Sequence, residues 1–224
     1  MMRTNRLTRF LLLAVLVAAC TGRGEQTAHD LTVALHTEET ARTEALRLAQ
    51  TARADSLMTV EAMLHAMAEG KRIRATGARG LAAHAPHADS PGEDLSGQDE
   101  VDTTRTESLR EGLKRLMERE RERGQSTYAA YAHEASRNGR HAEAQWFAQG
   151  AQTAEGLAAL LTYVIGNLDN RSVLAAVYAT CPHCGNVSAG TTERTCAVCH
   201  TDARNFMLQI ATHTDATTGA TRIH

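Results

Sequence analysis

The sequence has few residues that interrupt helices and few that build sheets. It contains only 3 prolines in 224 residues, and aromatic residues make up 4% of the chain. Proline breaks the interior of a helix, and aromatic side chains are enriched in strands. Their scarcity, together with the many alanines, favours a mostly α-helical protein with one compact domain and a small appendage.

The chain also lacks a strong net charge. It carries 24 lysines and arginines against 26 acidic residues, a formal net charge of −2. A nucleic-acid-binding surface needs a basic excess, so we expect no nucleic-acid partner. The one basic run, from Arg115 to Arg123, is interleaved with glutamates, a pattern typical of a solvated helix face.

The apolar run near the N-terminus is too short to cross a membrane. As a helix, Phe10 to Ala19 would span about 15 Å, half of the roughly 30 Å hydrocarbon core. Three arginines precede the run, as in export signals. Residues Leu16 to Cys20 resemble a bacterial lipoprotein signal, in which the cysteine becomes the lipidated first residue.

This resemblance predicts a signal peptide over residues 1–19 and a tether over residues 20–29. It implies a protein held on a bacterial membrane by lipid on Cys20, facing the periplasm or the exterior. Loss of the three arginines would leave 21 basic residues against 26 acidic ones, a balance of −5.

Four of the five cysteines form two C-x-x-C pairs, Cys181 with Cys184 and Cys196 with Cys199. Eleven residues separate the pairs, a spacing typical of a tetrahedral four-thiolate site for one zinc or iron ion. Two alternatives are two disulfides in an exported protein and haem attachment at Cys196-x-x-Cys199-His200. Haem would leave the first pair unexplained, and the metal interpretation accounts for all four thiols.

Each cysteine pair is followed by a residue suited to the tight turn of a metal-binding knuckle. We expect positive φ at Gly185 and at His200, because glycine adopts this conformation freely and histidine does so more often than most residues. Tyr178 and Phe206 flank the knuckles, and we expect one of them to shield the metal from water.

Residues 30–167 show helical periodicity in four segments, with a loop over residues 84–102 that is rich in proline, glycine and acidic residues. Two helices precede the loop, and Gly77 and Gly80 are expected to fray the end of the second. After the loop, Thr104-x-x-Glu107 resembles a capping box, and Asn138-Gly139 predicts a helix stop. Four helices with one long middle connection predict a ferritin-like bundle. A metal module over residues 168–212 and a disordered tail over residues 213–224 complete the predicted organisation.

Charged residues interrupt the apolar stripes of three of these helices. They are Glu38 on the first helix, Lys71 and Arg74 on the second, and Glu120 and Arg123 on the third. Buried charges need partners, so we predict a glutamate–lysine/arginine cluster at the bundle centre. The alternative is that the helices are rotated and these side chains lie in water.

Together, the bundle and the Cys-Pro-x-Cys-Gly-Asn … Cys-x-x-Cys module resemble rubrerythrin over roughly residues 30–209. Rubrerythrins hold two irons with a glutamate from each of two helices and a Glu-x-x-His from each of the other two. The family register puts Glu38 and Glu120 at carboxylate positions and Arg123 in place of a third carboxylate. Lys71/Arg74 and Ala154/Leu157 fall where the Glu-x-x-His motifs belong.

No Glu-x-x-His occurs anywhere in the chain, so we expect no di-iron centre. A displaced site on Glu61 and His65, one turn apart, is the alternative to a simple surface pair. The leading hypothesis is a membrane-anchored, rubrerythrin-like metalloprotein with one iron or zinc ion in the four-cysteine site and no catalytic residues of its own. If the metal is iron, the resemblance implies one-electron transfer or a role in oxidative stress, and the sequence does not choose between the two metals. A zinc-stabilised envelope scaffold and a peroxide-reducing di-iron enzyme are the alternatives. The resemblance further implies a redox protein partner and a homodimer.

Overall fold

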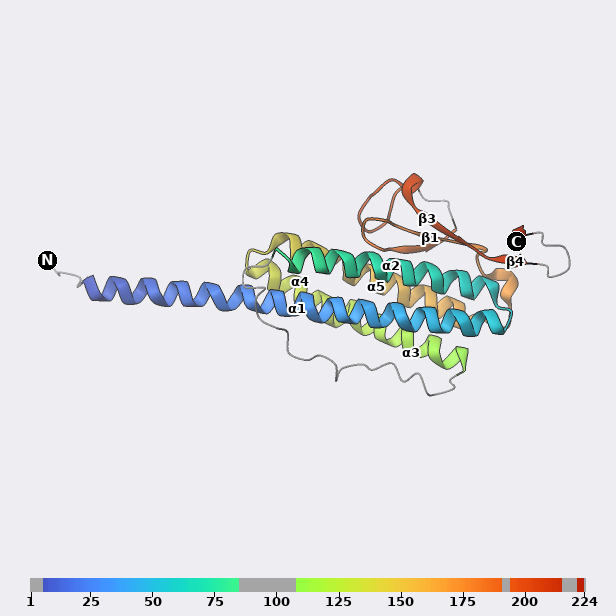
Figure 1. Ribbon diagram of the computed structural model, residues 1–224, viewed down its shortest axis with the longest axis horizontal. Helices are drawn as coiled ribbons and strands as arrows, with labels where there is room; N and C mark the ends of the chain where they lie inside the picture. The colour runs from blue at the N-terminus through green and yellow to red at the C-terminus, as the bar shows by residue number, and fades with distance from the viewer. Residues whose placement is uncertain (1–5, 85–107, 191–193, 215–220, 224) are drawn as a thin grey trace.

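The computed structural model describes residues 6–84, 108–190, 194–214 and 221–223. Figure 1 shows an elongated helical bundle with a small strand-containing module on one side. The helices are α1 (Arg6–Ala54), α2 (Met58–Ala82), α3 (Leu109–Glu122), the π-helix η2 (Arg123–Thr127), α4 (Tyr128–Arg137) and α5 (His141–Gly166). Since α3, η2 and α4 run on without a break, they make one long member of the bundle. The predicted fold class is confirmed.

Helix α1 is longer than the sequence patterns predict. It runs through residues 20–29, where a tether was expected, and projects beyond the bundle (Figure 1). This segment contains no proline, and Thr27, Asp30 and Leu31 at its end are buried, so packing favours continuation of the helix. Cys20 lies within α1, but its side chain is outside the described part of the structure.

Helix α2 continues past the two glycines that were expected to fray it. It ends at Ala82, and a Cβ atom on Gly77 would lie 2.6 Å from the indole Nε1 of Trp146. The close approach of α5 therefore explains Gly77 better than fraying does. Most of the predicted loop, 85–102, is outside the described residues. Its flanking helices end and begin at opposite ends of the bundle, as a crossover requires (Figure 1).

The third bundle helix begins with a side-chain N-cap, but at a later position than expected. Ser108 is the N-cap residue, and its Oγ accepts a hydrogen bond from the backbone N–H of Glu111 and donates one to the Glu111 carboxylate. The pattern Ser-x-x-Glu thus recurs four residues after Thr104-x-x-Glu107, which lies outside the described residues. The helix stop is confirmed, since Gly139 has φ of 72°.

Two apolar clusters fill the bundle. The larger joins α1, α2, α3 and α5 to the first strand of the module, with Leu48, Met63, Leu113, Leu161 and Tyr178 among its members. The smaller lies toward the other end and is aromatic. Its members Tyr128 and Phe147 have ring centroids 5.8 Å apart. The charge cluster described below lies on the same helices.

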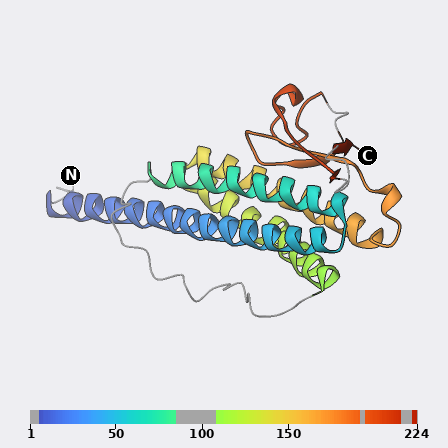
Figure 2. The ribbon, with the colours of Figure 1, turned by 45° about the vertical axis from the view of Figure 1, so that its right-hand side comes forward.

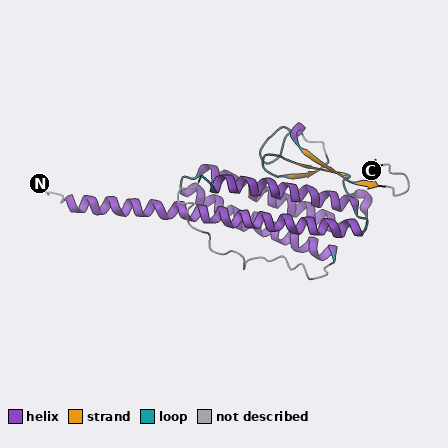
Figure 3. Cartoon of the chain, viewed as in Figure 1, coloured by secondary structure: helices purple, strands orange, loops and turns teal. Residues whose placement is uncertain are grey.

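The module is a three-stranded antiparallel sheet in the order β2-β1-β3. Figures 2 and 3 show the module beside the helical bundle. Its strands are β1 (Val177–Thr180), β2 (Val187–Ala189) and β3 (Met207–Ile210), with short 3₁₀ turns η3 (Arg171–Val173) and η4 (Ala203–Asn205). Central strand β1 leads into the first cysteine knuckle, and β2 leaves it. The sheet therefore fixes both ends of that knuckle.

The C-terminal segment was predicted to be disordered, but it forms a strand pair. Strand β4 (Thr212–Thr214) pairs antiparallel with β5 (Thr221–Ile223). Its threonines are β-branched, and such residues favour strands, so the composition that suggested disorder also suits a hairpin. In the part of the chain that the structure describes, no helix combines the length and apolar character needed to cross a membrane.

Candidate metal centre and buried charge cluster

The two cysteine pairs form matching knuckles held by backbone hydrogen bonds. In the first, Gly185 N–H donates to Cys181 O (3.0 Å) and Cys181 N–H donates to Asn186 O (2.8 Å). In the second, His200 N–H donates to Cys196 O (2.9 Å) and Cys196 N–H donates to Thr201 O (2.8 Å). The φ angles of Gly185 and His200 are 75° and 60°, which confirms the two positive-φ turns.

The four sulfur atoms converge on one point. All lie within 4.8 Å of one another, and the Cys181–Cys199 and Cys184–Cys196 Sγ pairs are each 3.5 Å apart. Bonds of about 2.3 Å to one tetrahedral ion would place sulfurs about 3.8 Å apart, so the arrangement fits a single metal ion. All four cysteines are free thiols, which removes the disulfide alternative.

The sulfurs are mostly shielded from water and lie within hydrogen-bond distance of one another in two pairs. Phe206 and Val198 pack against Cys181, Cys184 and Cys196, whereas Tyr178 belongs to the bundle core. The Cys184 thiol donates a hydrogen bond to Cys181 and lowers the pKa of Cys181 to about 4. The same interaction raises the pKa of Cys184. A lowered thiol pKa favours the thiolate form that a metal ion binds.

The first knuckle rests directly on α2 of the bundle. A Cβ atom on Gly70 would lie 2.4 Å from Gly185 O, and a Cβ on Gly185 would lie 2.4 Å from Gly70 O. Neither position tolerates a side chain, because the two backbones are in contact. The buried hydroxyl of Thr180, just before Cys181, donates to Ala66 O of α2 at 3.0 Å. The module is thus fixed on the helix that carries Lys71 and Arg74.

The five charged residues on the apolar stripes meet in the bundle interior. The Lys71 ammonium lies between two carboxylates, 3.1 Å from Glu38 Oε2 and 2.7 Å from Glu120 Oε2. Arg74 Nε is 2.8 Å from Glu38 Oε1, and Arg123 pairs with Glu120. Both carboxylates are fully buried, so the alternative of rotated helices with these charges in water does not describe this structure.

Aromatic residues complete the cluster, and the sequence patterns did not single them out for this role. The Tyr128 hydroxyl donates to Glu38 Oε1 at 2.8 Å, and the Arg74 guanidinium stacks 3.9 Å from the Trp146 ring centroid. Burial acts against the Glu38 carboxylate, but the charges of Lys71, Arg74 and Arg123 outweigh it and lower its pKa to about 2. Burial and the Glu38 charge raise the pKa of Tyr128, which stays protonated.

The basic run Arg115 to Arg123 is only partly the solvated face that its pattern suggested. Arg115 and Arg119 both bind the buried carboxylate of Glu44 on α1, with Arg119 Nη1 at 2.8 Å. Arg123 is itself buried. Arginines four residues apart share one helix face, which was the available signal for a common acidic partner.

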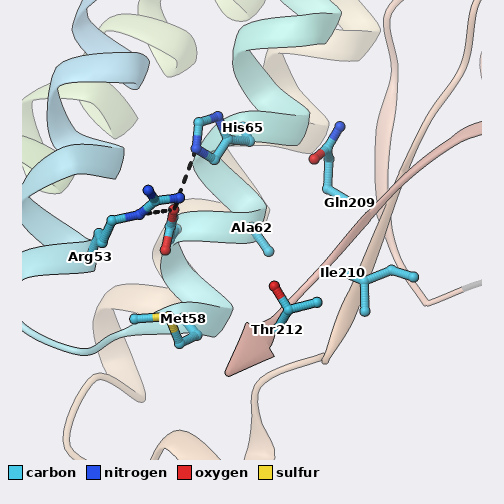
Figure 4. A pocket seen from close by; sticks show the side chains of 8 residues that line it. Arg53, Met58, Ala62, His65, Gln209, Ile210 and Thr212 are labelled. Carbon is cyan, nitrogen blue, oxygen red and sulfur yellow. Dashed lines mark hydrogen bonds and ion pairs between the residues drawn. The ribbon is translucent and has the colours of Figure 1, made fainter. Parts of the chain in front are cut away.

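Glu61 and His65 lie in a surface pocket where α1 and α2 meet β3 and β4 (Figure 4). The Glu61 carboxylate accepts a hydrogen bond from Arg53 Nε at 2.7 Å, and His65 Nε2 is 3.6 Å away. Arg53 thus pairs with the Glu61 carboxylate, which a displaced metal site would need as a ligand. Within the described residues, the four cysteines form the one group of three or more metal-binding side chains.

A helical bundle with a knuckle-type four-cysteine module at its C-terminal side defines a rubrerythrin-like fold. The chain is similar in structure to nigerythrin, a rubrerythrin. The fully reduced, all-ferrous state of nigerythrin superposes with a TM-score of 0.70 at 19% identity, covering 81% of this chain and 86% of that one. Its mixed-valence state gives a TM-score of 0.69 over the same shares of the two chains. No family model matches the sequence, and a search of curated proteins finds no relative.

Proposed function

We propose that the chain is a membrane-anchored, rubrerythrin-like metalloprotein that holds one iron ion in its four-cysteine site and transfers single electrons. The observation that supports this most is the convergence of four sulfurs on two preformed knuckles. A tetrahedral set of four thiolates suits a single iron or zinc ion. When bound, iron supplies a reversible one-electron change. Phe206 and Val198 keep water from the sulfurs, and the knuckle backbone holds them in place.

We further propose that the bundle holds no di-iron centre. At the positions where the family uses Glu-x-x-His, this chain has Lys71 and Arg74, whose cations pair with Glu38 and Glu120. Ammonium and guanidinium groups donate hydrogen bonds and offer no lone pair to a metal. These ion pairs argue that the chain is not a peroxide-reducing di-iron enzyme.

Metal analysis and a visible spectrum of the purified full-length protein test both proposals. We expect close to one iron per chain and the strong colour of ferric tetrathiolate. A colourless protein with one zinc per chain would contradict the electron-transfer proposal. Close to three metal ions per chain would contradict the proposed absence of the di-iron centre.

The zinc outcome leads to a second candidate, an envelope scaffold in which the metal only stabilises the module. Strand β3, at the edge of the sheet, exposes Leu208 (48%) and Ile210 (38%), which are apolar side chains that a protein partner would cover. Zinc has no redox chemistry, so this candidate requires a binding partner and no electron donor.

Anchoring through Cys20 is proposed on the signal-like residues that precede it. We expect mass spectrometry of the mature protein to show a lipid-bearing Cys20 at the N-terminus, and Cys20→Ser to abolish partitioning into detergent. An unmodified peptide that spans Ala19 and Cys20 would contradict the anchor. A redox protein partner and a homodimer are proposed on the family resemblance alone.

A further inference from the structure

We propose that the buried charge cluster and the four-cysteine site act as one electrostatic unit. The cluster carries an excess positive charge on the helix that supports the first knuckle, and this charge favours negative charge on the four sulfurs. It therefore raises the reduction potential of iron held there. The proposal rests on the proposed function only in the choice of iron as the probe.

The cluster carries one more positive charge than negative charge. Three cations, Lys71, Arg74 and Arg123, face two carboxylates, Glu38 and Glu120. The remaining ionisable group, the Tyr128 hydroxyl, donates its proton to Glu38 and is neutral. Exposed fractions run from 0% for the two carboxylates to 7% for Arg123. Salt screens charges in such surroundings much less than charges on the surface.

Helix α2 carries Lys71 and Arg74 of the cluster and also supports the first knuckle. Gly70, whose carbonyl contacts Gly185, precedes Lys71 directly in the sequence. The Cγ atom of Arg74 lies 3.1 Å from the position of a Cβ on Gly185, so the stem of Arg74 passes beneath the residue next to Cys184. The backbone contact and the Thr180–Ala66 hydrogen bond fix this spacing. The cluster and the knuckle are therefore joined by packed protein of α2.

The sign of the effect follows from the charge of a tetrathiolate iron site. Four thiolates around ferric iron sum to −1, and one electron from a reduced one-electron carrier protein takes the site to −2. A nearby positive charge stabilises the −2 state more. At an effective dielectric of about 20, a unit charge on the order of 10 Å away shifts this equilibrium roughly tenfold. A tenfold change for one electron corresponds to about 59 mV.

Two substitutions in the cluster should move the potential in opposite directions. Lys71→Met removes the excess positive charge, and we expect the iron-loaded, full-length protein to lose roughly tenfold in its reduction equilibrium, about 59 mV. Glu120→Gln removes a negative charge at almost constant shape, and we expect a shift of similar size upward. Arg72→Met is the matched control, because Arg72 lies on the same helix beside Lys71, with its side chain 48% exposed and paired with Glu69. Its shift should be less than twofold and should vanish at high salt.

Opposite signs separate this electrostatic role from a structural one. If the substitutions only loosened the module, both would move the potential in the same direction and alter the visible spectrum. That result, or two shifts no larger than that of Arg72→Met, would overturn the proposal. Should Lys71→Met fail to fold, Arg123→Gln makes the same charge change farther along the cluster and tests the same sign. A protein that is purified with zinc would defeat the proposed electron transfer, whereas potentials of the iron-reconstituted chain would still test the coupling.

Discussion

The four-cysteine site and the centre of the bundle both gather ionisable side chains away from water, and they differ in what balances the charge. The module brings four thiols together within 4.8 Å of one another. The bundle centre brings two carboxylates together and supplies three cations from the same helices. One set therefore needs an ion from solution, and the other is already paired.

This difference shows why a shared fold does not transfer a shared chemistry. The structural similarity to nigerythrin covers 81% of this chain, but at 19% identity it shows the fold alone. Buried carboxylates can be held by metal ions or by lysine and arginine, and the packing of the surrounding helices can be similar in both cases. The residues at the bundle centre determine whether metal ions or lysine and arginine side chains pair with its carboxylates.

Replacing one ligand should have the largest effect, because the four sulfurs together hold one metal ion. Cys184→Ser removes one sulfur of a pair 3.5 Å apart, and we expect metal content to fall from about one ion per chain to near zero. Metal binding and folding of so small a unit are coupled, so the module should also become sensitive to protease. Cys20→Ser, which leaves the knuckles intact, should retain the metal. Full metal content in Cys184→Ser would place the ion elsewhere.

Removing one partner of the bundle cluster should be the next most damaging change. Glu120→Ala leaves Lys71 and Arg123 with an uncompensated charge in the interior, and we expect a loss of roughly 3–5 kcal/mol in the free energy of unfolding. Chemical denaturation measures the loss. Glu118→Ala, at an exposed pair on the same helix, should change stability by less than about 0.5 kcal/mol. Equal effects of the two substitutions would mean that water solvates the charges of the cluster.

Acid should weaken the bundle through Glu38 within a defined pH window. Its pKa is lowered from 4.5 to about 2, so the folded state is stabilised when the carboxylate is ionised. This contribution is fully present above the unfolded pKa and is lost as pH falls from about 4.5 through about 2. We expect stability to fall more steeply with acid in the wild type than in Glu38→Gln. Parallel stability curves for the two proteins would contradict the assignment.

The smallest of these effects tests the contact between the two regions. Gly70→Ala would place a Cβ 2.4 Å from Gly185 O, and we expect a cost of about 1–3 kcal/mol and looser docking of the module. Gly80→Ala on the same helix has no atom within 4 Å of the added Cβ and should stabilise the protein by up to about 1 kcal/mol. Limited proteolysis of the module and thermal unfolding distinguish the two. Similar behaviour of both variants would mean that the knuckle does not rest on α2.

Patterns with a fixed local spacing could be read from the sequence. Two C-x-x-C pairs, followed by Gly185 and His200, specify the knuckles because their geometry involves only a few consecutive residues. Helical periodicity likewise placed Glu38, Lys71 and Glu120 on inward-facing stripes. Whether a segment is helical, and which of its faces is apolar, depends on residues close together in the chain. Such features can therefore be predicted without knowledge of the tertiary fold.

Features created by contacts between distant segments could not be predicted in this way. Docking of Gly185 on Gly70 joins residues 115 apart, and nothing local marks either glycine for it. The arginines that bind Glu44 looked solvated because their partner lies on another helix. The helix in place of the expected tether has a similar cause, since burial of Thr27 and Leu31 outweighs the weak helical preference of the preceding glycines.

The π-helix Arg123–Thr127 determines how α4 is rotated about the helix axis relative to α3. In a regular α-helix, residues five apart differ by about 140° around the axis, so Arg123 and Tyr128 would face different neighbours. The wider turn brings them nearer to one face, and both reach the same cluster. If the same residues formed a regular α-helix without this wider turn, α4 would be rotated by about 100° relative to α3. The cluster and the aromatic end of the bundle are thus kept in register by a single extra residue.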